Sequence, residues 1–119
     1  MGRLTAPFAP RLDFQPKTLS VPPNAPFRWV IPPSDAPVRV TRFTLEAGPL
    51  AAFTVCPRTS ITPCKGPAVC AVPQGQTFPA GGDCNADDPP GPSVRVSVRN
   101  DDDILWITAP NGPVSLKAE

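Results

Sequence analysis

The sequence predicts an all-β protein, a small antiparallel β-sandwich or barrel of about six strands, similar in size to a jelly-roll or immunoglobulin-like domain. Valines at positions 94, 96 and 98 alternate with polar residues, which is the period of a strand with one apolar and one wet face. The 119 residues include 20 prolines, and each proline fixes φ and lacks a backbone N–H. Long helices are therefore excluded wherever these prolines fall.

The clearest strands lie at the end of the chain, over residues 94–98, 104–108 and 114–116. Asn100 and the aspartates after it separate the first two runs, and Asn111-Gly112 lies between the last two. Asn, Asp and Gly favour chain reversals between strands. We therefore expect these three runs to pair with one another as an antiparallel meander.

Three further strands are expected in the first half of the chain, at Phe27–Ile31, Val38–Ala47 and Ala51–Val55. A turn at Gly48-Pro49 separates the second from the third. We interpret Trp29, in the first of them, as a core anchor or a subunit contact, and Trp106 in the same way.

The strand at residues 38–47 changes the parity of its apolar side chains. Val38 and Val40 occupy even positions, whereas Phe43 and Leu45 occupy odd ones. Because successive side chains of a strand point to opposite faces, a regular strand would expose one of the two pairs. We predict a β-bulge at Thr41–Arg42, which would turn both pairs to the core.

Residues 1–24 are predicted to form an extended, proline-rich arm, and residues 25–119 a single sandwich domain with an irregular loop at 56–92. Prolines hold a segment extended and lower the entropy lost when it docks on a surface. The arm also carries apolar residues at no fixed period, and we expect these to contact a partner: Leu4, Phe8, Leu12 and Phe14. A disordered tail is the alternative that this composition also predicts.

All four cysteines lie in the loop at 56–92, at Cys56, Cys64, Cys70 and Cys84. An even number of cysteines in one irregular loop favours two disulfides, and we expect a nested pairing of Cys56 with Cys84 and of Cys64 with Cys70. Zinc is a second interpretation, but the spacings of seven, five and thirteen residues do not resemble the short knuckles of zinc sites. Free thiols are the third.

Metal and catalytic sites have little support in the sequence. Asp83, Asn85 and Asp87 match the first ligands of a calcium loop, but the glycine and the final glutamate of that loop are missing, so we regard them as weak calcium candidates. The three aspartates at 101–103 form a second anionic cluster. The chain has no His to activate a cysteine nucleophile and no phosphate-binding glycine loop. We expect neither an enzyme nor a cofactor, and no catalytic residues.

The formal charge of +1 hides an uneven distribution. Residues 1–80 carry eight Lys and Arg against three Asp and Glu, whereas residues 81–119 carry three against seven. Such a molecule can pack its basic end against the acidic end of a copy of itself. The basic residues are dispersed and do not alternate with aromatic rings, so we do not expect nucleic-acid binding. No apolar run predicts a signal peptide or a membrane span.

From these observations we expect a structural role for the protein. We expect a subunit of a large assembly, such as a capsid decoration (cement) protein or tail component of a bacteriophage or viral virion, made in the host cytoplasm. Its partners would be the capsid or tail and other copies of itself in a homo-oligomer, with a trimer as the first expectation. The alternative is an extracellular carbohydrate-binding or adhesin-like β-sandwich module, although Phe78 is its sole candidate sugar platform in the loop.

Overall fold

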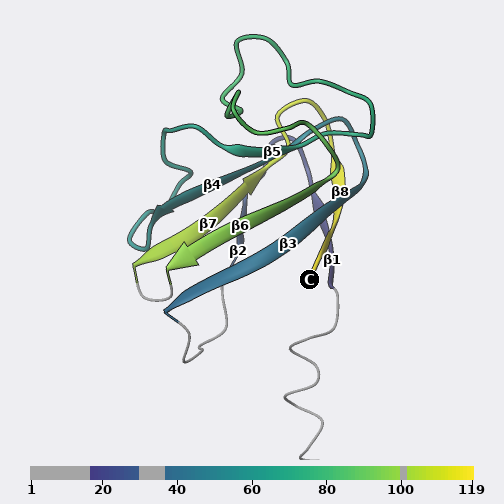
Figure 1. Cartoon of the computed structure of the whole chain (residues 1–119). Coiled ribbons are helices and arrows are strands. Elements are labelled where there is room, and N and C mark those ends of the chain that lie inside the picture. Colours follow the sequence, from purple (N-terminus) through teal and green to yellow (C-terminus); the bar gives the residue numbers. More distant parts are fainter. Residues whose placement is uncertain (1–16, 30–36, 100–101) are drawn as a thin grey trace, which may run out of the picture.

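The computed structural model describes residues 17–29, 37–99 and 102–119, and these form a β-sandwich (Figure 1). Two antiparallel sheets of four strands each face one another, which confirms the predicted fold class. Sheet A has the order β1-β8-β3-β6 and sheet B the order β2-β7-β4-β5. The strands are β1 (Lys17–Val21), β2 (Phe27–Trp29), β3 (Val38–Ala47), β4 (Ala51–Pro57), β5 (Val69–Ala71), β6 (Ser93–Arg99), β7 (Asp103–Thr108) and β8 (Val114–Ala118).

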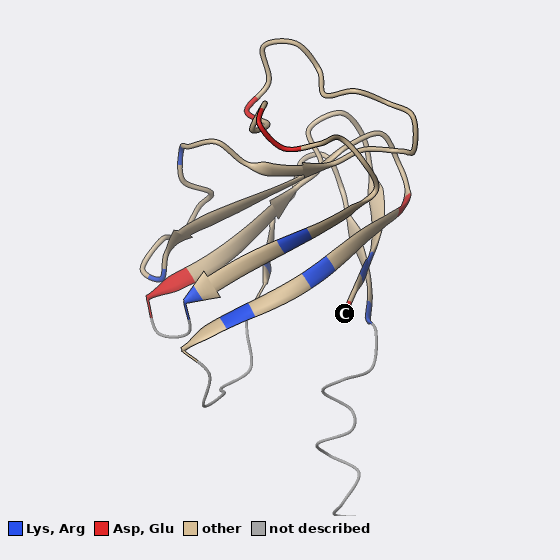
Figure 2. Ribbon diagram, in the orientation of Figure 1, with Lys and Arg blue, Asp and Glu red and all other residues tan. Residues whose placement is uncertain are grey.

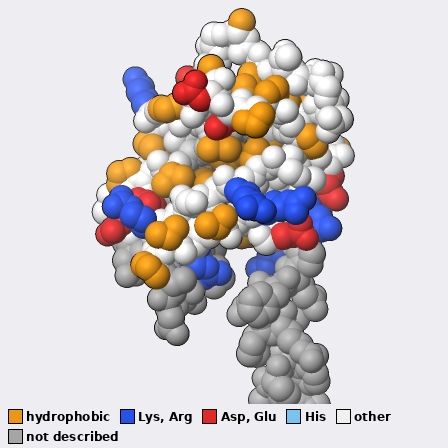
Figure 3. Space-filling view, viewed as in Figure 1, with side chains coloured by type: hydrophobic (Ala, Val, Ile, Leu, Met, Phe, Trp, Pro, Cys, Tyr) orange, Lys and Arg blue, Asp and Glu red, His pale blue; other side chains and the backbone are white. Residues whose placement is uncertain are grey.

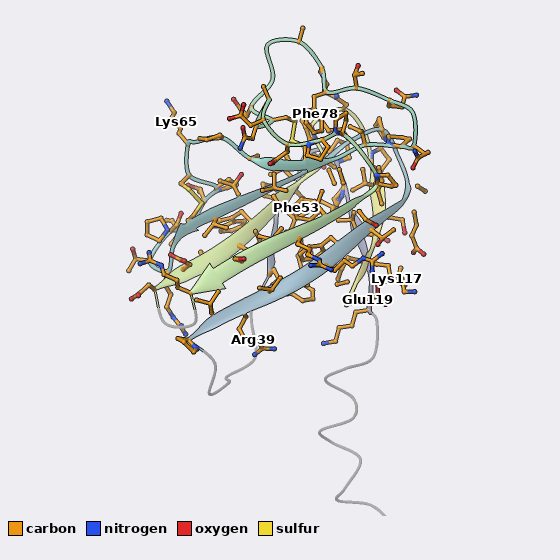
Figure 4. All side chains as sticks on the ribbon, viewed as in Figure 1. Arg39, Phe53, Lys65, Phe78, Lys117 and Glu119 are labelled. Carbon is orange, nitrogen blue, oxygen red and sulfur yellow. A yellow bond between two sulfur atoms is a disulfide. The ribbon has the colours of Figure 1, made fainter. Side chains whose placement is uncertain are left out.

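The core lies between the two sheets. Each strand contributes alternate side chains to it, such as Phe43 of β3 and Phe53 of β4, which are both fully buried. Figure 4 labels Phe53. The centroids of these two rings lie 4.7 Å apart, so they join sheet A to sheet B directly. Trp29 meets Phe43 edge to face at 5.6 Å and is half-buried against the core, as expected of a core anchor.

The last three strands are present, but the predicted meander is wrong. β6 and β8 belong to sheet A, whereas β7 lies between β2 and β4 in sheet B. The chain therefore crosses from one sheet to the other at each reversal. The reason is visible in β7, where four consecutive residues, Ile104–Ile107, are buried. Such a strand needs apolar cover on both faces, and its position in sheet B provides this cover, from sheet A on one side and from the Cys56–Cys64 loop on the other.

The predicted bulge at Thr41–Arg42 is also wrong. β3 pairs with β6 in unbroken register from Val38 to Thr44, and its register shift comes later, between Leu45 and Ala47, where it pairs with β8. Regular pairing preserves the hydrogen bonds that a bulge would disrupt. Its consequence is that Val38 and Val40 lie on the outer face of sheet A, with 47% and 59% of their surface exposed.

Two strands were not anticipated. β1 lies inside the range 1–24 that we assigned to the arm; it pairs with β8 and places Val21 in the core. β5 lies inside the loop at 56–92 and pairs with β4. The domain therefore begins before residue 25. The arm residues Leu4, Phe8, Leu12 and Phe14 lie outside the described residues, as do residues 30 and 31 of the first predicted strand, so these assignments stay predictions.

The turn at Gly48-Pro49 carries the chain from β3 in sheet A to β4 in sheet B. Gly48 has φ of +109°, and a Cβ at this position would lie 2.5 Å from the carbonyl oxygen of Pro113. Only glycine fits this conformation and this close approach. In the described part of the chain, no helix is long and apolar enough to cross a membrane.

The register of β3 can be tested by comparing two alanine substitutions. Phe43→Ala removes a buried ring and is expected to lower the free energy of unfolding by about 3–5 kcal/mol. Val40→Ala, on the exposed face of the same strand, should change it by less than about 0.5 kcal/mol. Urea unfolding followed by tryptophan fluorescence measures both. A large loss in the Val40 variant would mean that this side chain faces the core.

Candidate functional site

Two disulfides are present, and their pairing differs from the nested one that we expected. Cys56 is bonded to Cys64 and Cys70 to Cys84, with Cα–Cα distances of 5.8 and 5.5 Å. The cause is the pairing of β5: Ala68, just before this strand, forms a bridge with Cys84 and so brings it beside Cys70. Cys56 lies at the other end of β4 and pairs with Cys64, the next cysteine along the chain. Stable disulfides indicate a non-reducing environment.

The two bridged loops form a layer over the outer face of sheet B (Figure 1). The Cys56–Cys64 bridge packs against Ile104 and Trp106 of β7, and Cys70 packs among Leu50 and Ala52. Trp106 is thereby buried, which agrees with a role as an anchor, but its indole N–H has no acceptor among the described residues. Phe78 is half-buried against the second cluster (Figure 4), so the loop does not present it as a free platform for a sugar ring.

A cavity of about 470 Å³ lies between the bridged loops and sheet B. Its lining includes Thr54 and Thr108 from the strands below, and Lys65 and Asp83 from the loops. Both disulfides contribute to the wall through Cys64, Cys70 and Cys84. The layer is thus tied to the sheet by covalent bonds and encloses a mixed polar and apolar space.

The outer face of sheet A carries exposed side chains of another kind. Val38 and Val40 are followed on the same face of β3 by Arg42, which lies directly opposite Arg95 of β6. Figure 2 shows basic residues on these two strands and acidic residues in the loop above β5, and Figure 3 shows that basic and acidic side chains both lie on this side of the molecule. The hydroxyl oxygens of Thr44 and Ser93 lie 3.2 Å apart in the next row.

This exposed face differs from the inward-facing arrangement that the predicted bulge implies. The signal was present, because a regular strand over Val38–Ala47 necessarily exposes one of its two apolar pairs. The bulge that we predicted removed the signal by turning all of these side chains inward. No local pattern indicates Arg42 and Arg95, because nothing in the sequence shows that β3 and β6, with these two residues 53 positions apart, pair there.

The calcium candidates are not arranged as a metal site. Asp83 and Asp87 are exposed, and the side-chain oxygen Oδ1 of Asn85 accepts a hydrogen bond of 3.1 Å from the backbone N–H of Asp87. This bond is that of a local turn. No group of three or more Cys, Asp or Glu side chains within residues 17–29, 37–99 and 102–119 is close enough to hold a metal ion.

The second acidic cluster contains an ion pair. The guanidinium of Arg99 donates two hydrogen bonds of 3.0 Å to the carboxylate of Asp103, whose side chain is 11% exposed. Asp102 lies 3.9 Å from the same guanidinium, and its side chain is 68% exposed. The side-chain hydrogen bonds from Arg99 hold the pKa of the Asp103 carboxyl below its usual value. This pair joins β6 in sheet A to β7 in sheet B.

Comparison with known proteins gives no match to this chain among protein-family models, curated proteins or solved structures. The fold and the surfaces therefore define its class by themselves. It is a β-sandwich domain with two disulfides, in which loops cover the outer face of one sheet while the outer face of the other carries exposed valines and arginines.

The disulfide pairing predicts a definite result for thiol counting and peptide mapping. The native chain should show no free thiol and the reduced, unfolded chain four. Proteolysis under non-reducing conditions should give one peptide pair that joins Cys56 to Cys64 and another that joins Cys70 to Cys84. Replacing either pair by serine is expected to lower the free energy of unfolding by roughly 2–4 kcal/mol. A fragment joining Cys56 to Cys84 would contradict this arrangement.

The Arg99–Asp103 pair predicts a pH dependence of stability. Because the pKa of Asp103 is lower in the folded chain than in the unfolded one, its stabilising effect is complete above the unfolded pKa of about 3.9 and is lost as pH falls through the folded value. The wild type should therefore be more stable than Asp103→Asn at about pH 6, and the difference should shrink below about pH 4. Asp102→Asn is the control, with a much smaller change. Equal pH profiles for wild type and Asp103→Asn would show that the pair does not form in solution.

Proposed function

We propose that this chain is a structural subunit of a large assembly outside the reducing cytosol, of the kind formed by capsid decoration proteins or tail components of phage and viral virions. In this proposal the chain acts by binding and not by catalysis. The observation that carries the proposal is the difference between the two outer faces of the sandwich. Loops cover sheet B, whereas sheet A presents Val38 and Val40 with about half of their surface in water.

The outer face of sheet A, called the open face below, carries Val38, Val40, Arg42 and Arg95 and is suited to bind another flat protein surface. Its strands place apolar side chains, guanidinium groups and hydroxyl groups in adjacent rows, and both Val38 and Val40 come from the part of β3 that pairs with the outermost strand β6. Apolar groups surrounded by polar ones are typical of protein contacts, where the centre excludes water and the rim stays wet. A neighbouring subunit of the assembly would cover the two valines.

The disulfides support a site of action outside the cytosol. A virion component is made in the host cytoplasm and meets an oxidising medium when the cell lyses, which would allow the two bridges to form after synthesis. Once formed, they hold the loop layer on sheet B whether or not the assembly is present.

The N-terminal arm has a place in this proposal as a second attachment. Leu4, Phe8, Leu12 and Phe14 would bind in grooves of a neighbour while the prolines keep the segment extended. A truncation that tests this must end before Lys17, because β1 begins there and contributes Val21 to the core. Deleting residues 1–14 removes all four anchors and leaves β1 intact.

The proposal predicts that the chain sediments with particles. A tagged chain is expressed in cells that carry its gene. The cleared culture is then separated on a density gradient. Wild type should migrate with particles far larger than a free oligomer. The double variant Val38→Asp/Val40→Asp should lose most of this association, by at least about tenfold, because covering the exposed halves of the two valines together contributes about 1.5 kcal/mol or more.

Ile61→Asp is the matched control for this experiment. Ile61 is 87% exposed but lies in the loop closed by the Cys56–Cys64 bridge, away from the open face. The control should remain with the particles. Wild-type protein that stays at the top of a gradient containing particles, or a double variant that migrates like wild type, would contradict the proposal.

A further inference from the structure

A groove of about 560 Å³ runs along β6 at the side of the sandwich. Its lining joins four parts of the chain: Arg42 of β3, Val94 and Arg95 of β6, Val69 of β5, and Asp88 of the loop before β6. β5 and β6 are the outermost strands of their sheets. The groove therefore lies where the free edges of the two sheets come together, which is a place that another chain can reach.

Within the described residues Arg42 and Arg95 form no ion pair of 4 Å or less, although the exposed Glu119 lies opposite Arg42 where β3 pairs with the end of the chain. Arg42 and Arg95 are both exposed and lie directly opposite each other in the β3–β6 register, an arrangement that like charges make unfavourable. Asp88 lines the same groove, yet within the described residues no ion pair of 4 Å or less joins it to either arginine. Asp87, next to it, is exposed.

These charges define the chemistry of the occupant. A simple anion would bind the two guanidinium groups but would also face the carboxylate of Asp88, and a simple cation would meet the two arginines. A fitting partner carries both signs, with its acidic group opposite Arg42 and Arg95 and its basic group opposite Asp88. The groove itself presents both signs side by side, so it is complementary to a copy of itself turned by half a rotation.

We propose that this groove is the contact with a second copy of the chain in a two-fold dimer. Arg42 and Arg95 of each copy pair with Asp88, and with the exposed Asp87 beside it, of the other copy. A two-fold contact uses the same patch on both subunits, whereas a trimer needs two different patches. Because both signs share one groove, the structure favours a dimer over the trimer that we expected from the sequence. The inference rests on the proposed function in one respect, that the chain works as one of several copies.

The contact with a second copy would also bury apolar side chains that remain partly exposed to water in the single chain. Val69 and Val94 are half-buried in the groove, and a second copy would remove the rest of their surface from water. Partial burial would strengthen the ion pairs between the arginines of each copy and the aspartates of the other, because charges interact more strongly where the dielectric constant is lower. It would in addition shield the free edge of β6, which could otherwise pair with other strands.

Sedimentation velocity of the full chain tests the dimer. At about 100 μM protein, a dimer is expected at about 20 mM salt and a shift toward monomer at about 500 mM, where exposed charges are screened. Two variants make the groove uniformly charged: Arg42→Glu/Arg95→Glu makes it acidic, and Asp87→Lys/Asp88→Lys makes it basic. Each variant alone should dimerise at least about tenfold more weakly than wild type, because like charges then face each other.

The decisive sample is the equal mixture of the two variants. The acidic groove of one and the basic groove of the other are again complementary, so the mixture should form a heterodimer although neither variant dimerises alone. A variant that had failed to fold could not give this result. Arg28→Glu is the matched control, since Arg28 is an exposed arginine of β2 in sheet B and its reversal should leave the dimer unchanged.

Several outcomes would overturn the proposal: a monomeric wild type at low salt, variants that dimerise like wild type, a trimer, or a mixture that stays monomeric. A monomer that binds a sulfated polysaccharide through Arg42 and Arg95 would instead assign the groove to an anionic polymer. If the dimer fails while the chain still migrates with particles, the groove assignment alone falls. If the dimer forms and the chain does not migrate with particles, the proposed function alone falls.

Discussion

Strand β7 buries the side chains on both of its faces, from Ile104 to Ile107. The layered arrangement of the molecule follows from this constraint. Leu105 and Ile107 point into the core, where sheet A covers them, while Ile104 and Trp106 point to the other side of sheet B. A strand that is apolar on both faces is stable only when both are covered. The chain meets this need with sheet A on one side and the bridged loops on the other, so its described residues form three layers.

The third layer needs its disulfides because it has little regular structure. Between β4 and β6 the chain forms a single strand of three residues, β5, so few backbone hydrogen bonds offset the entropy lost when the loop is ordered. The bridges Cys56–Cys64 and Cys70–Cys84 reduce that loss by limiting the unfolded chain. The loops also leave the buried indole N–H of Trp106 without an acceptor in the described chain.

Covering sheet B has consequences for the rest of the surface. The outer face of sheet A keeps its valines, arginines and hydroxyl groups in water, and we propose this face for attachment. The groove at its edge combines arginines from the sheet with Asp88 from the loop layer. The position of that loop depends on the Cys70–Cys84 bridge and on backbone hydrogen bonds that join Ala68 to Asp83 and to Asn85. The same layer that protects β7 therefore also places one wall of the groove.

The fold class and most of the strands could be predicted from the sequence, because alternation of apolar residues and the exclusion of helices by proline are local properties that a short window reveals. It also placed all four cysteines in one loop and indicated two bridges. Other features follow from the tertiary structure and have no local signal. β7 joins sheet B, Cys84 lies beside Cys70, Val38 and Val40 face water, and Arg42 lies opposite Arg95. Each of these depends on which distant segments pair. A local pattern gives the face on which a side chain lies, but it does not say which strand or loop will cover that face.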